Sequence, residues 1–139
     1  MNLFTYGTLM DREIFAAVAG CSRPGCRAVL PGYARFQVCG EVYPAIRSGD
    51  GSVEGILYQA VDELALQRCD RFEGAEYARR TVMVRTAEGR CEEAQVYVFA
   101  TDQYHRLSAD DWNFAAFLRR HKRTYLQACE ASDADTDQK

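Results

Sequence analysis

The chain has 139 residues, of which 47% are hydrophobic, and this is enough apolar material for one core in one domain. Its formal net charge of −3 excludes the strongly basic balance that is typical of general nucleic-acid binders. No apolar run approaches the roughly 20 residues needed to cross a bilayer, so we expect no contact with a membrane interior.

The first element in chain order is a short strand expected over residues 2–6, which stops at Gly7. Because Gly7 has no Cβ, a ligand can approach the main chain of Gly7, Thr8 and Leu9 closely. Backbone N–H groups exposed at such a break suit a carboxylate or a developing oxyanion. An ordinary strand-to-helix turn is the alternative interpretation of these residues taken alone.

A helix is predicted next, from Asp11 as N-cap to about Ala19, and Gly20 is expected to end it. Residues 26–59 are interrupted at 31–32, at 40, at 44 and at 48–51 by proline, glycine, serine and aspartate. We expect the intervening β-like runs to be several short strands. They would form a small barrel or a strongly bent sheet.

A second helix is predicted from about Asp62 to Arg71, with Phe72 anchoring its end and Glu73 delivered to the mouth of the barrel. The residues expected to face inward on this helix are Leu64, Ala65 and Cys69. Residues 77–86 and 91–99 read as two strands of a hairpin, joined by residues 87–90 with Gly89 at the positive φ angle.

The last helix is predicted to start at residues 108–111, with Ser108 as its cap. The residues expected to pack it on the barrel are Trp112, Ala115, Ala116, Leu118 and Tyr125. The basic run at 119–123 is interpreted as a solvated helical face rather than an anion site. We expect residues 1–129 to form one domain and residues 130–139 to be a disordered acidic tail.

Six cysteines are present, but there is no CxxC pair and neither histidine lies near the close pair Cys21 and Cys26. We therefore expect no metal site. The first residues lack the features of a signal peptide, so we expect a cytoplasmic protein with reduced thiols that act as small core residues. No G-x-S-x-G elbow and no Gly-rich phosphate loop occurs, which argues against a serine hydrolase and against nucleotide-dependent chemistry.

Four segments occur in an order and spacing typical of one family. They are Tyr6-Gly7-Thr8-Leu9, Tyr43-Pro44-Ala45-Ile46, Glu54-Gly55 and Asp70-x-Phe72-Glu73-Gly74-x-x-Tyr77-x-Arg79. Over residues 1 to about 128 the chain resembles the γ-glutamylcyclotransferase-like superfamily, in particular its small AIG2-like members. The resemblance implies a mixed α/β fold on a small barrel with flanking helices.

The resemblance also implies a reaction, of an acyltransferase or lyase type without metal or cofactor. A small γ-glutamyl amine or amino acid carries its own nucleophile, the α-amino group, which attacks the γ-carbonyl to give 5-oxoproline and a free amine. The protein must supply a folded substrate conformation, one group that moves a proton, and donors for the oxyanion. A non-catalytic small-molecule binder, or a related hydrolytic or amine-handling reaction in the same pocket, is the alternative.

Glu73 matches the catalytic glutamate of the family, so the resemblance implies that it is the general acid/base. Partial burial after Phe72 would raise its pKa and suit proton transfer near neutrality. The residues that the resemblance assigns to substrate binding are Tyr6, Gly7, Thr8, Leu9 and Tyr77. For Tyr6 and Tyr77 a role as core tyrosines is the alternative.

Three charged residues near Glu73 remain open in the sequence. Asp70 would share the helical face of Glu73 as a second carboxylate, although a capping or packing role is favoured. Strand alternation places only one of Arg79 and Arg80 inward, and neither is assigned to the substrate. The amine part of the substrate and the oligomeric state are not specified by the sequence.

Overall fold

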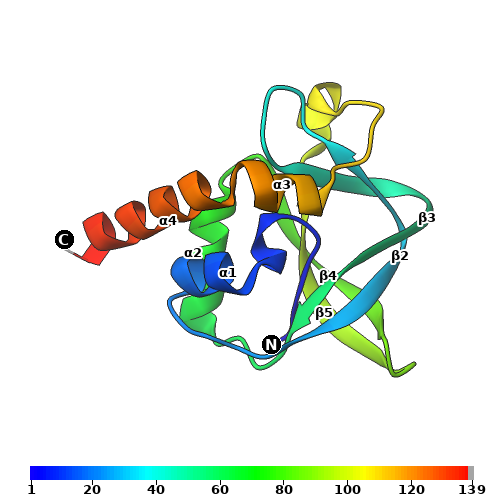
Figure 1. The fold of residues 1–139 in the computed structure, drawn as a ribbon. Coiled ribbons are helices and arrows are strands. Elements are labelled where there is room, and N and C mark those ends of the chain that lie inside the picture. The colour runs from blue at the N-terminus through cyan, green and yellow to red at the C-terminus, as the bar shows by residue number, and fades with distance from the viewer. Residues whose placement is uncertain (138–139) are drawn as a thin grey trace.

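The structure, a computed structural model, describes the backbone of residues 1–137 and the side chains of residues 1–131. Five strands close into a barrel in the order β1-β3-β2-β4-β5, and the α-helices gather on one side of it (Figure 1). The strands are β1 (Leu3–Thr5), β2 (Gly25–Gln37), β3 (Pro44–Tyr58), β4 (Tyr77–Thr86) and β5 (Cys91–Phe99). The helices are η1 (Thr8–Met10), α1 (Arg12–Ala19), α2 (Glu63–Glu73), η2 (Thr101–Arg106), α3 (Phe114–Arg120) and α4 (Lys122–Asp137).

The barrel closes through the short strand β1. This strand pairs antiparallel with β3, where Thr5 lies opposite Ile56, and parallel with β5, where Leu3 lies opposite Gln95. The predicted hairpin is confirmed, because β4 and β5 pair antiparallel and Gly89 in the turn has φ 87°. The mixed α/β fold on a small barrel, predicted from the sequence, is therefore confirmed.

The prediction of several short strands between residues 26 and 59 is wrong, because the structure has two long strands there. β2 and β3 pair from Gly25 opposite Tyr58 to Gln37 opposite Pro44. The breakers at 31–32 fall at a register shift in the ladder instead of ending a strand. Gly32, with φ 83°, takes the conformation that such a bulge requires, and a proline is tolerated beside it.

The first helix begins and ends as predicted. The backbone N–H of Ile14 donates to Asp11 Oδ2 at 3.2 Å, and Gly20 has a left-handed φ of 78°. Such a cap satisfies one of the free donors at the helix start, and glycine adopts the left-handed end without strain.

Helix α2 begins after the predicted cap Asp62 but continues two residues beyond the predicted end, to Glu73. Its buried residues are Ala65, Leu66 and Cys69. The prediction that Leu64 faces inward is wrong, since this side chain is 59% exposed. One residue corresponds to about 100° around a helix, so the core face that passes through positions 65, 66 and 69 leaves position 64 on the outside.

The predicted helix start at Ser108 is also wrong. The backbone N–H of Ser108 donates to the carbonyl of Gln37 at 2.9 Å, and the N–H of Gln37 donates to the carbonyl of Asp110 at 2.9 Å. The segment therefore extends the end of β2, and the cap of α3 is Asn113, whose Oδ1 accepts from Ala116 N–H at 2.8 Å. Of the residues expected to pack this helix, Trp112 is buried, with 4% exposure.

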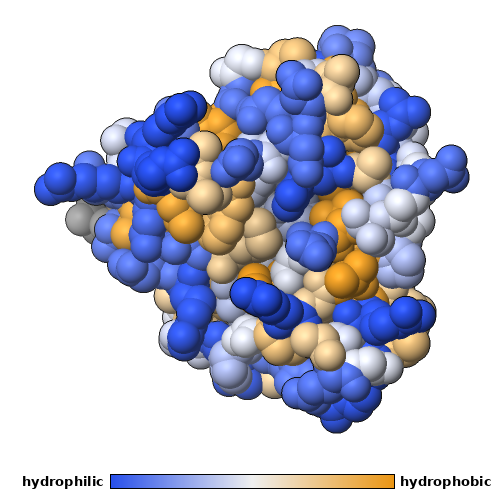
Figure 2. Space-filling model, turned by 45° about the vertical axis from the view of Figure 1, so that its right-hand side comes forward, coloured by the Kyte–Doolittle hydropathy of each residue, from blue (hydrophilic) through white to orange (hydrophobic). Residues whose placement is uncertain are grey.

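Two large buried clusters form the core, beside a smaller one of Val38, Ala45 and Phe99. One lies inside the barrel and contains Phe4, Leu30, Ile46, Leu57 and Val96. The other joins the barrel to the helices and contains Leu3, Phe15, Tyr58, Leu66 and Trp112. Charged and polar side chains cover most of the face in Figure 2, with small apolar patches between them.

The basic run at 119–123 is divided between α3 and α4, and within it Lys122 pairs with Asp11 at 3.0 Å and with Glu13 at 2.9 Å.

Residues 130–137, expected to be disordered, continue helix α4 as far as Asp137. Alanines at 128, 131 and 134 favour this conformation. The remainder of the predicted tail, 138–139, lies outside the described residues. Among the helices of the described chain, none is long and apolar enough to span a bilayer.

Candidate active site

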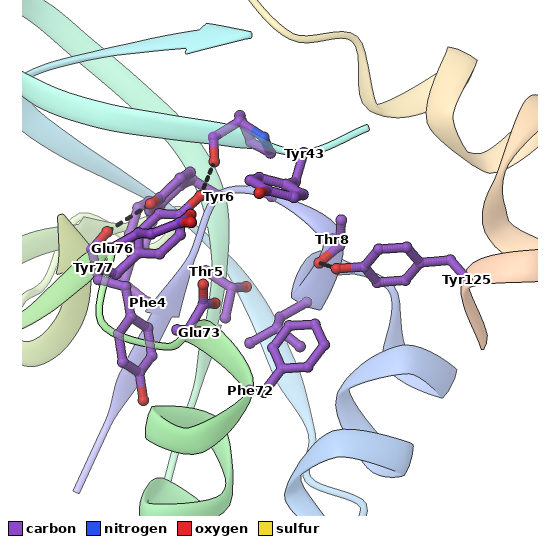
Figure 3. A pocket seen from close by; sticks show the side chains of 14 residues that line it. Phe4, Thr5, Tyr6, Thr8, Tyr43, Phe72, Glu73, Glu76, Tyr77 and Tyr125 are labelled. Atoms are coloured by element: carbon purple, nitrogen blue, oxygen red, sulfur yellow. Dashed lines mark hydrogen bonds between the residues drawn. The ribbon is translucent and has the colours of Figure 1, made fainter. Parts of the chain in front are cut away.

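A cavity of about 130 Å³ opens at the mouth of the barrel, where β1 ends. This volume is many times what one water molecule needs, so a small organic molecule can enter. All six residues that the sequence nominates contribute to its lining: Tyr6, Gly7, Thr8, Leu9, Glu73 and Tyr77. They come from the link after β1, from η1, from the end of α2 and from the start of β4. Figure 3 shows Tyr6, Thr8, Glu73 and Tyr77 around the cavity.

Glu73 is the last residue of α2, and its side chain points toward the end of β1 (Figure 3). The helix ends here because Gly74 follows with φ 78°, and its N–H donates to the carbonyl of Asp70 at 3.1 Å. The neighbouring Phe72 packs edge-on against Tyr125, with ring centroids 6.1 Å apart, which anchors this last turn.

Burial raises the pKa of Glu73 to about 8. Among the described side chains, no ion pair or hydrogen bond to its carboxyl group is present, and burial alone accounts for the shift in pKa. Desolvation without a compensating partner disfavours the charged form, so the group carries a proton for much of its time at neutral pH. A carboxyl group with such a pKa can both accept and donate a proton near neutrality.

The break after β1 presents backbone donors to the cavity. The first hydrogen bond inside η1 runs from Met10 N–H to the carbonyl of Gly7 at 3.0 Å, so the N–H groups of Gly7, Thr8 and Leu9 precede it. A Cβ built on Gly7 would lie 3.0 Å from both Cγ and Cδ of Pro44. Glycine thus allows the turn to pack against the rigid proline ring.

The hydroxyl groups of both nominated tyrosines donate hydrogen bonds to backbone carbonyl groups of the protein. Tyr6 donates to the carbonyl of Tyr97 at 2.6 Å, and Tyr77 donates to the carbonyl of Pro44 at 2.8 Å. Burial raises the pKa of both phenols above their usual value, so they remain neutral. Their rings line the cavity, while their hydroxyl protons hold β5 and the start of β3 in place.

Asp70 lies one turn before Glu73 but has partners of its own. It accepts a hydrogen bond from Tyr97 Oη at 2.6 Å and pairs with Arg79 Nε at 2.9 Å. Of the two interpretations left open by the sequence, this geometry favours the packing role. Arg79 lies on the face of β4 that meets α2 and is partly buried by this ion pair, whereas Arg80 is exposed.

Four further residues that line the cavity were not placed there by the sequence: Tyr43, Glu76, Tyr97 and Tyr125. Glu76 pairs with Arg106 Nη1 at 3.0 Å. Tyr125 of α4 lies within 3.4 Å of the Thr8 hydroxyl. These residues are far from β1 in the sequence, and no local pattern indicates that the barrel closure brings them together.

The cavity offers no cluster of metal-binding side chains among the described residues, where no group of three or more His, Cys, Asp or Glu was found. The sequence-based expectation of a metal-free site stays a prediction. The cavity is instead lined by the carboxyl group of Glu73 and by Gly7, Thr8 and Leu9. A carboxyl group can move a proton, and backbone N–H groups can bind an oxyanion.

Comparisons with known proteins point to one family. Residues 3–114 match the family model described as gamma-glutamyl cyclotransferase, AIG2-like. AIG2-like protein C of Arabidopsis thaliana is 32% identical over 130 residues, which cover 91% of this chain and 74% of the relative. AIG2-like protein A of the same plant is 30% identical over 128 residues, covering 91% of this chain and 77% of the relative.

Solved structures show the same fold. An Arabidopsis thaliana protein determined in solution superposes with a TM-score of 0.72 at 27% identity, covering 91% of this chain and 78% of that one. A structure described as a gamma-glutamyl cyclotransferase gives a TM-score of 0.62 at 20% identity, covering 71% of this chain and 66% of that one. At that identity the second likeness shows the fold alone.

Proposed function

Because this chain belongs to the gamma-glutamyl cyclotransferase, AIG2-like family, we propose that it cyclises the γ-glutamyl group of a small γ-glutamyl amine or amino acid. The products are 5-oxoproline and the free amine. The observation that carries the proposal is the carboxyl group of Glu73, which lies without a pairing side chain in a cavity also lined by the backbone of Gly7, Thr8 and Leu9.

Glu73 would act first as a base and then as an acid. The substrate enters with its α-amino group protonated, and ionised Glu73 takes one proton from that ammonium. The amine nitrogen then forms a bond to the γ-carbonyl carbon, and the carbonyl electron pair moves to oxygen. Glu73 then gives its proton to the leaving nitrogen, and the bond between that nitrogen and the γ-carbon breaks as the oxyanion re-forms the carbonyl. The ring nitrogen, which still carries two protons, loses one to the ionised Glu73, and the released amine takes up that proton. Proton transfer of this kind contributes roughly 100- to 10,000-fold in rate.

The substrate ammonium helps to prepare Glu73 for the first step. The empty site favours the neutral carboxyl group because burial raises its pKa to about 8. A cation beside the carboxyl group favours ionisation and lowers that pKa. Binding of an ammonium therefore generates the base at the moment when it is needed.

The N–H groups of Gly7, Thr8 and Leu9 would hold oxygen atoms of the γ-glutamyl group. In this proposal they face either the α-carboxylate or the oxyanion that forms on the γ-carbonyl oxygen. One such donor to an oxyanion is worth about 100- to 1,000-fold in rate in other acyl-transfer enzymes. The reaction requires no metal or cofactor, because the substrate supplies its own nucleophile. We place it in the cytoplasm, since all six cysteines, which lie within the described residues, are free.

The test is the release of 5-oxoproline from a panel of γ-glutamyl amino acids and γ-glutamyl amines, measured for the wild type and for Glu73→Gln. We expect release from one class of substrate and a loss of at least about 100-fold in kcat in the variant, because glutamine cannot move the proton. Glu63→Gln is the matched control, since Glu63 is exposed at the opposite end of the same helix.

Binding separates catalysis from the alternative role. If Glu73→Gln still binds a γ-glutamyl compound but no longer turns it over, the result supports Glu73 as the proton shuttle. A wild type that binds such compounds without releasing 5-oxoproline is a small-molecule binder, and the proposal is then wrong. Equal activity of Glu73→Gln and Glu63→Gln contradicts the role of Glu73.

A further inference from the structure

Arg35 of β2 binds the main chain at the turn that supplies the backbone donors, although it is not itself among the residues that line the cavity. Its Nη1 donates to the carbonyl oxygen of Tyr6 at 2.9 Å. The side chain of Arg35 is only 17% exposed, so this hydrogen bond lies largely away from water. A charged donor to a carbonyl forms a stronger bond than a neutral one does.

The guanidinium group is held in place from two further sides. Its Nε and Nη2 donate to the two carboxylate oxygens of Asp111 at 2.8 and 3.4 Å. Its Cζ lies 5.7 Å from the ring centroid of Trp112, whose Nε1 donates to the carbonyl of Val42 at 2.8 Å. Arginine offers a planar fork that can satisfy a carboxylate, a carbonyl and an aromatic face together, which lysine cannot.

Because the peptide bond is planar, the hydrogen bond from Arg35 to the Tyr6 carbonyl also fixes the direction of the Gly7 N–H. In a trans peptide the carbonyl of Tyr6 and the N–H of Gly7 lie in one plane and point in opposite directions. When Arg35 fixes the carbonyl on its own side, the N–H of Gly7 is directed away from Arg35. The residue that bears this N–H lines the cavity, whereas Arg35 does not.

We propose that Arg35 is a positioning residue that holds the Tyr6–Gly7 peptide so that the N–H of Gly7 faces the substrate. The inference rests on the proposed function, in which this N–H binds an oxygen of the γ-glutamyl group. Arg35 also polarises the peptide, because a hydrogen bond to the carbonyl strengthens the N–H of the same peptide as a donor. Asp111, through Arg35, then contributes to the same geometry.

Arg47 provides a matched control for Arg35. It lies on the neighbouring strand β3, and it too has its guanidinium over an aromatic ring, with Cζ 4.7 Å from the centroid of Tyr104. It is exposed, and no hydrogen bond from it to the turn after β1 is present among the described residues. Replacing it removes the same charge and the same kind of ring contact without touching Tyr6.

The experiment compares Arg35→Met, Arg35→Lys and Arg47→Met. Methionine keeps much of the apolar stem of arginine but has no donor, whereas lysine restores a charge and one donor. We expect Arg35→Met to lower kcat/KM about 10- to 100-fold, the size of effect seen when one donor to a reacting oxygen is weakened. Arg35→Lys should recover at least about fivefold of that loss, and Arg47→Met should stay within about threefold of the wild type.

A second readout follows the amide itself and does not depend on activity. Selective ¹⁵N-glycine labelling gives one amide signal for each of the ten glycines, and Gly7→Ala identifies the signal of Gly7. We expect Arg35→Met to move the Gly7 signal and to leave that of Gly89, in the β4–β5 turn, in place. Arg47→Met should move neither signal.

The two readouts separate the failure of this inference from failure of the proposed function. If the wild type releases no 5-oxoproline, the proposed function is wrong, and a selective shift of the Gly7 signal still supports the role of Arg35. The role of Arg35 is overturned if the Gly7 signal does not move in Arg35→Met. It is also overturned if the kcat/KM of Arg35→Met lies within threefold of that of Arg47→Met. If Arg35→Lys does not recover activity and all glycine signals are displaced, then Arg35 has only a structural role. That outcome also overturns the inference. Should Arg35→Met fail to fold, Arg35→Lys is judged by the Gly7 signal alone, and a Gly7 signal that stays at its wild-type position overturns the inference.

Discussion

At the scale of the single residue, the unusual property of the site is a carboxyl group whose burial is not offset by a partner. Asp70, only one turn earlier, has both a tyrosine hydroxyl and an arginine. Glu76, three residues later, has Arg106. Glu73 has neither kind of partner among the described side chains, and burial raises its pKa to about 8. Glu73 is therefore the carboxyl group of this segment whose burial is not offset by a side-chain partner.

This shift in pKa makes the stability of the protein depend on pH. Glu73 binds a proton more tightly in the folded state, at about 8, than in the unfolded state, at about 4.5. Its contribution to stability is therefore fully present below about pH 4.5 and is lost as pH rises through about 8. We expect Glu73→Gln to gain stability relative to the wild type between pH 5 and pH 9, by on the order of 2 kcal/mol.

Urea unfolding of both proteins at pH 5, 7 and 9 measures this difference. Glu63→Gln serves as control, because that side chain is exposed and its difference from the wild type should stay constant over the same range. A difference between Glu73→Gln and the wild type that does not change with pH would show that Glu73 is already ionised in the empty site.

At the scale of the element, the site depends on how closely β1 approaches β3. β1 has only three residues, and Gly55 of β3 is the neighbour of Ile56, which pairs with Thr5 at the end of β1. A Cβ built on Gly55 would overlap the carbonyl oxygen of Thr5 and would lie 2.7 Å from Cζ of Phe4. The absence of a side chain at position 55 thus lets β1 close the barrel and place the turn at Gly7 beside the end of α2.

We expect Gly55→Ala to destabilise the protein by about 3 kcal/mol or more, because backbone atoms of β1 cannot move aside without breaking the barrel ladder. The measurement is the free energy of urea unfolding. Gly49→Ala is the matched control in the same strand, where the new Cβ would make an ordinary contact with the Cβ of Ala34 at 3.4 Å. Equal stability of the two variants would show that β1 does not need the close approach.

At the scale of the whole molecule, helices α1 to α4 lie together on one side of the barrel (Figure 1). The cavity is lined from both layers, by Tyr77 of β4 and by Phe72 and Tyr125 of the helices. Lys122 joins α4 to Asp11 and Glu13 of the first helix region. Tyr125 of α4 contacts both Phe72 and Thr8. The same helical layer thus covers the apolar side of the barrel and completes one wall of the site.

The reactivity of the cysteines shows whether the helices remain packed on the barrel. Cys39 and Cys91 are exposed, whereas Cys69 and Cys129 are buried and burial raises their pKa to about 12 and about 11. Only the thiolate reacts rapidly with a disulfide reagent. We therefore expect two thiols to react at once with Ellman's reagent and two to react only as the protein unfolds.

The kinetics of thiol modification in native buffer and in urea test this prediction. Reductant should leave the unfolding midpoint unchanged, because all six cysteines are free. Rapid reaction of Cys69 in native buffer, located by mass spectrometry of the modified peptides, would contradict the packing of α2 on the barrel.

The sequence alone determined the features that depend on neighbouring residues. The strand that stops before Gly7, the cap at Asp11, the cap at Asp62 and the hairpin around Gly89 each need only a few adjacent side chains, and the structure contains all four. The order of short motifs was also enough to indicate the family and the barrel.

Tertiary structure decided what depends on residues far apart in the chain. The long pairing of β2 with β3 overrides the breakers at 31–32, and a hydrogen bond to Gln37 replaces the predicted cap at Ser108. The unpaired state of Glu73 and the contact of Arg35 with Tyr6 likewise arise only when the barrel closes. Local propensities are worth about 1 kcal/mol or less per residue, so strand register and burial overrule them wherever the two disagree.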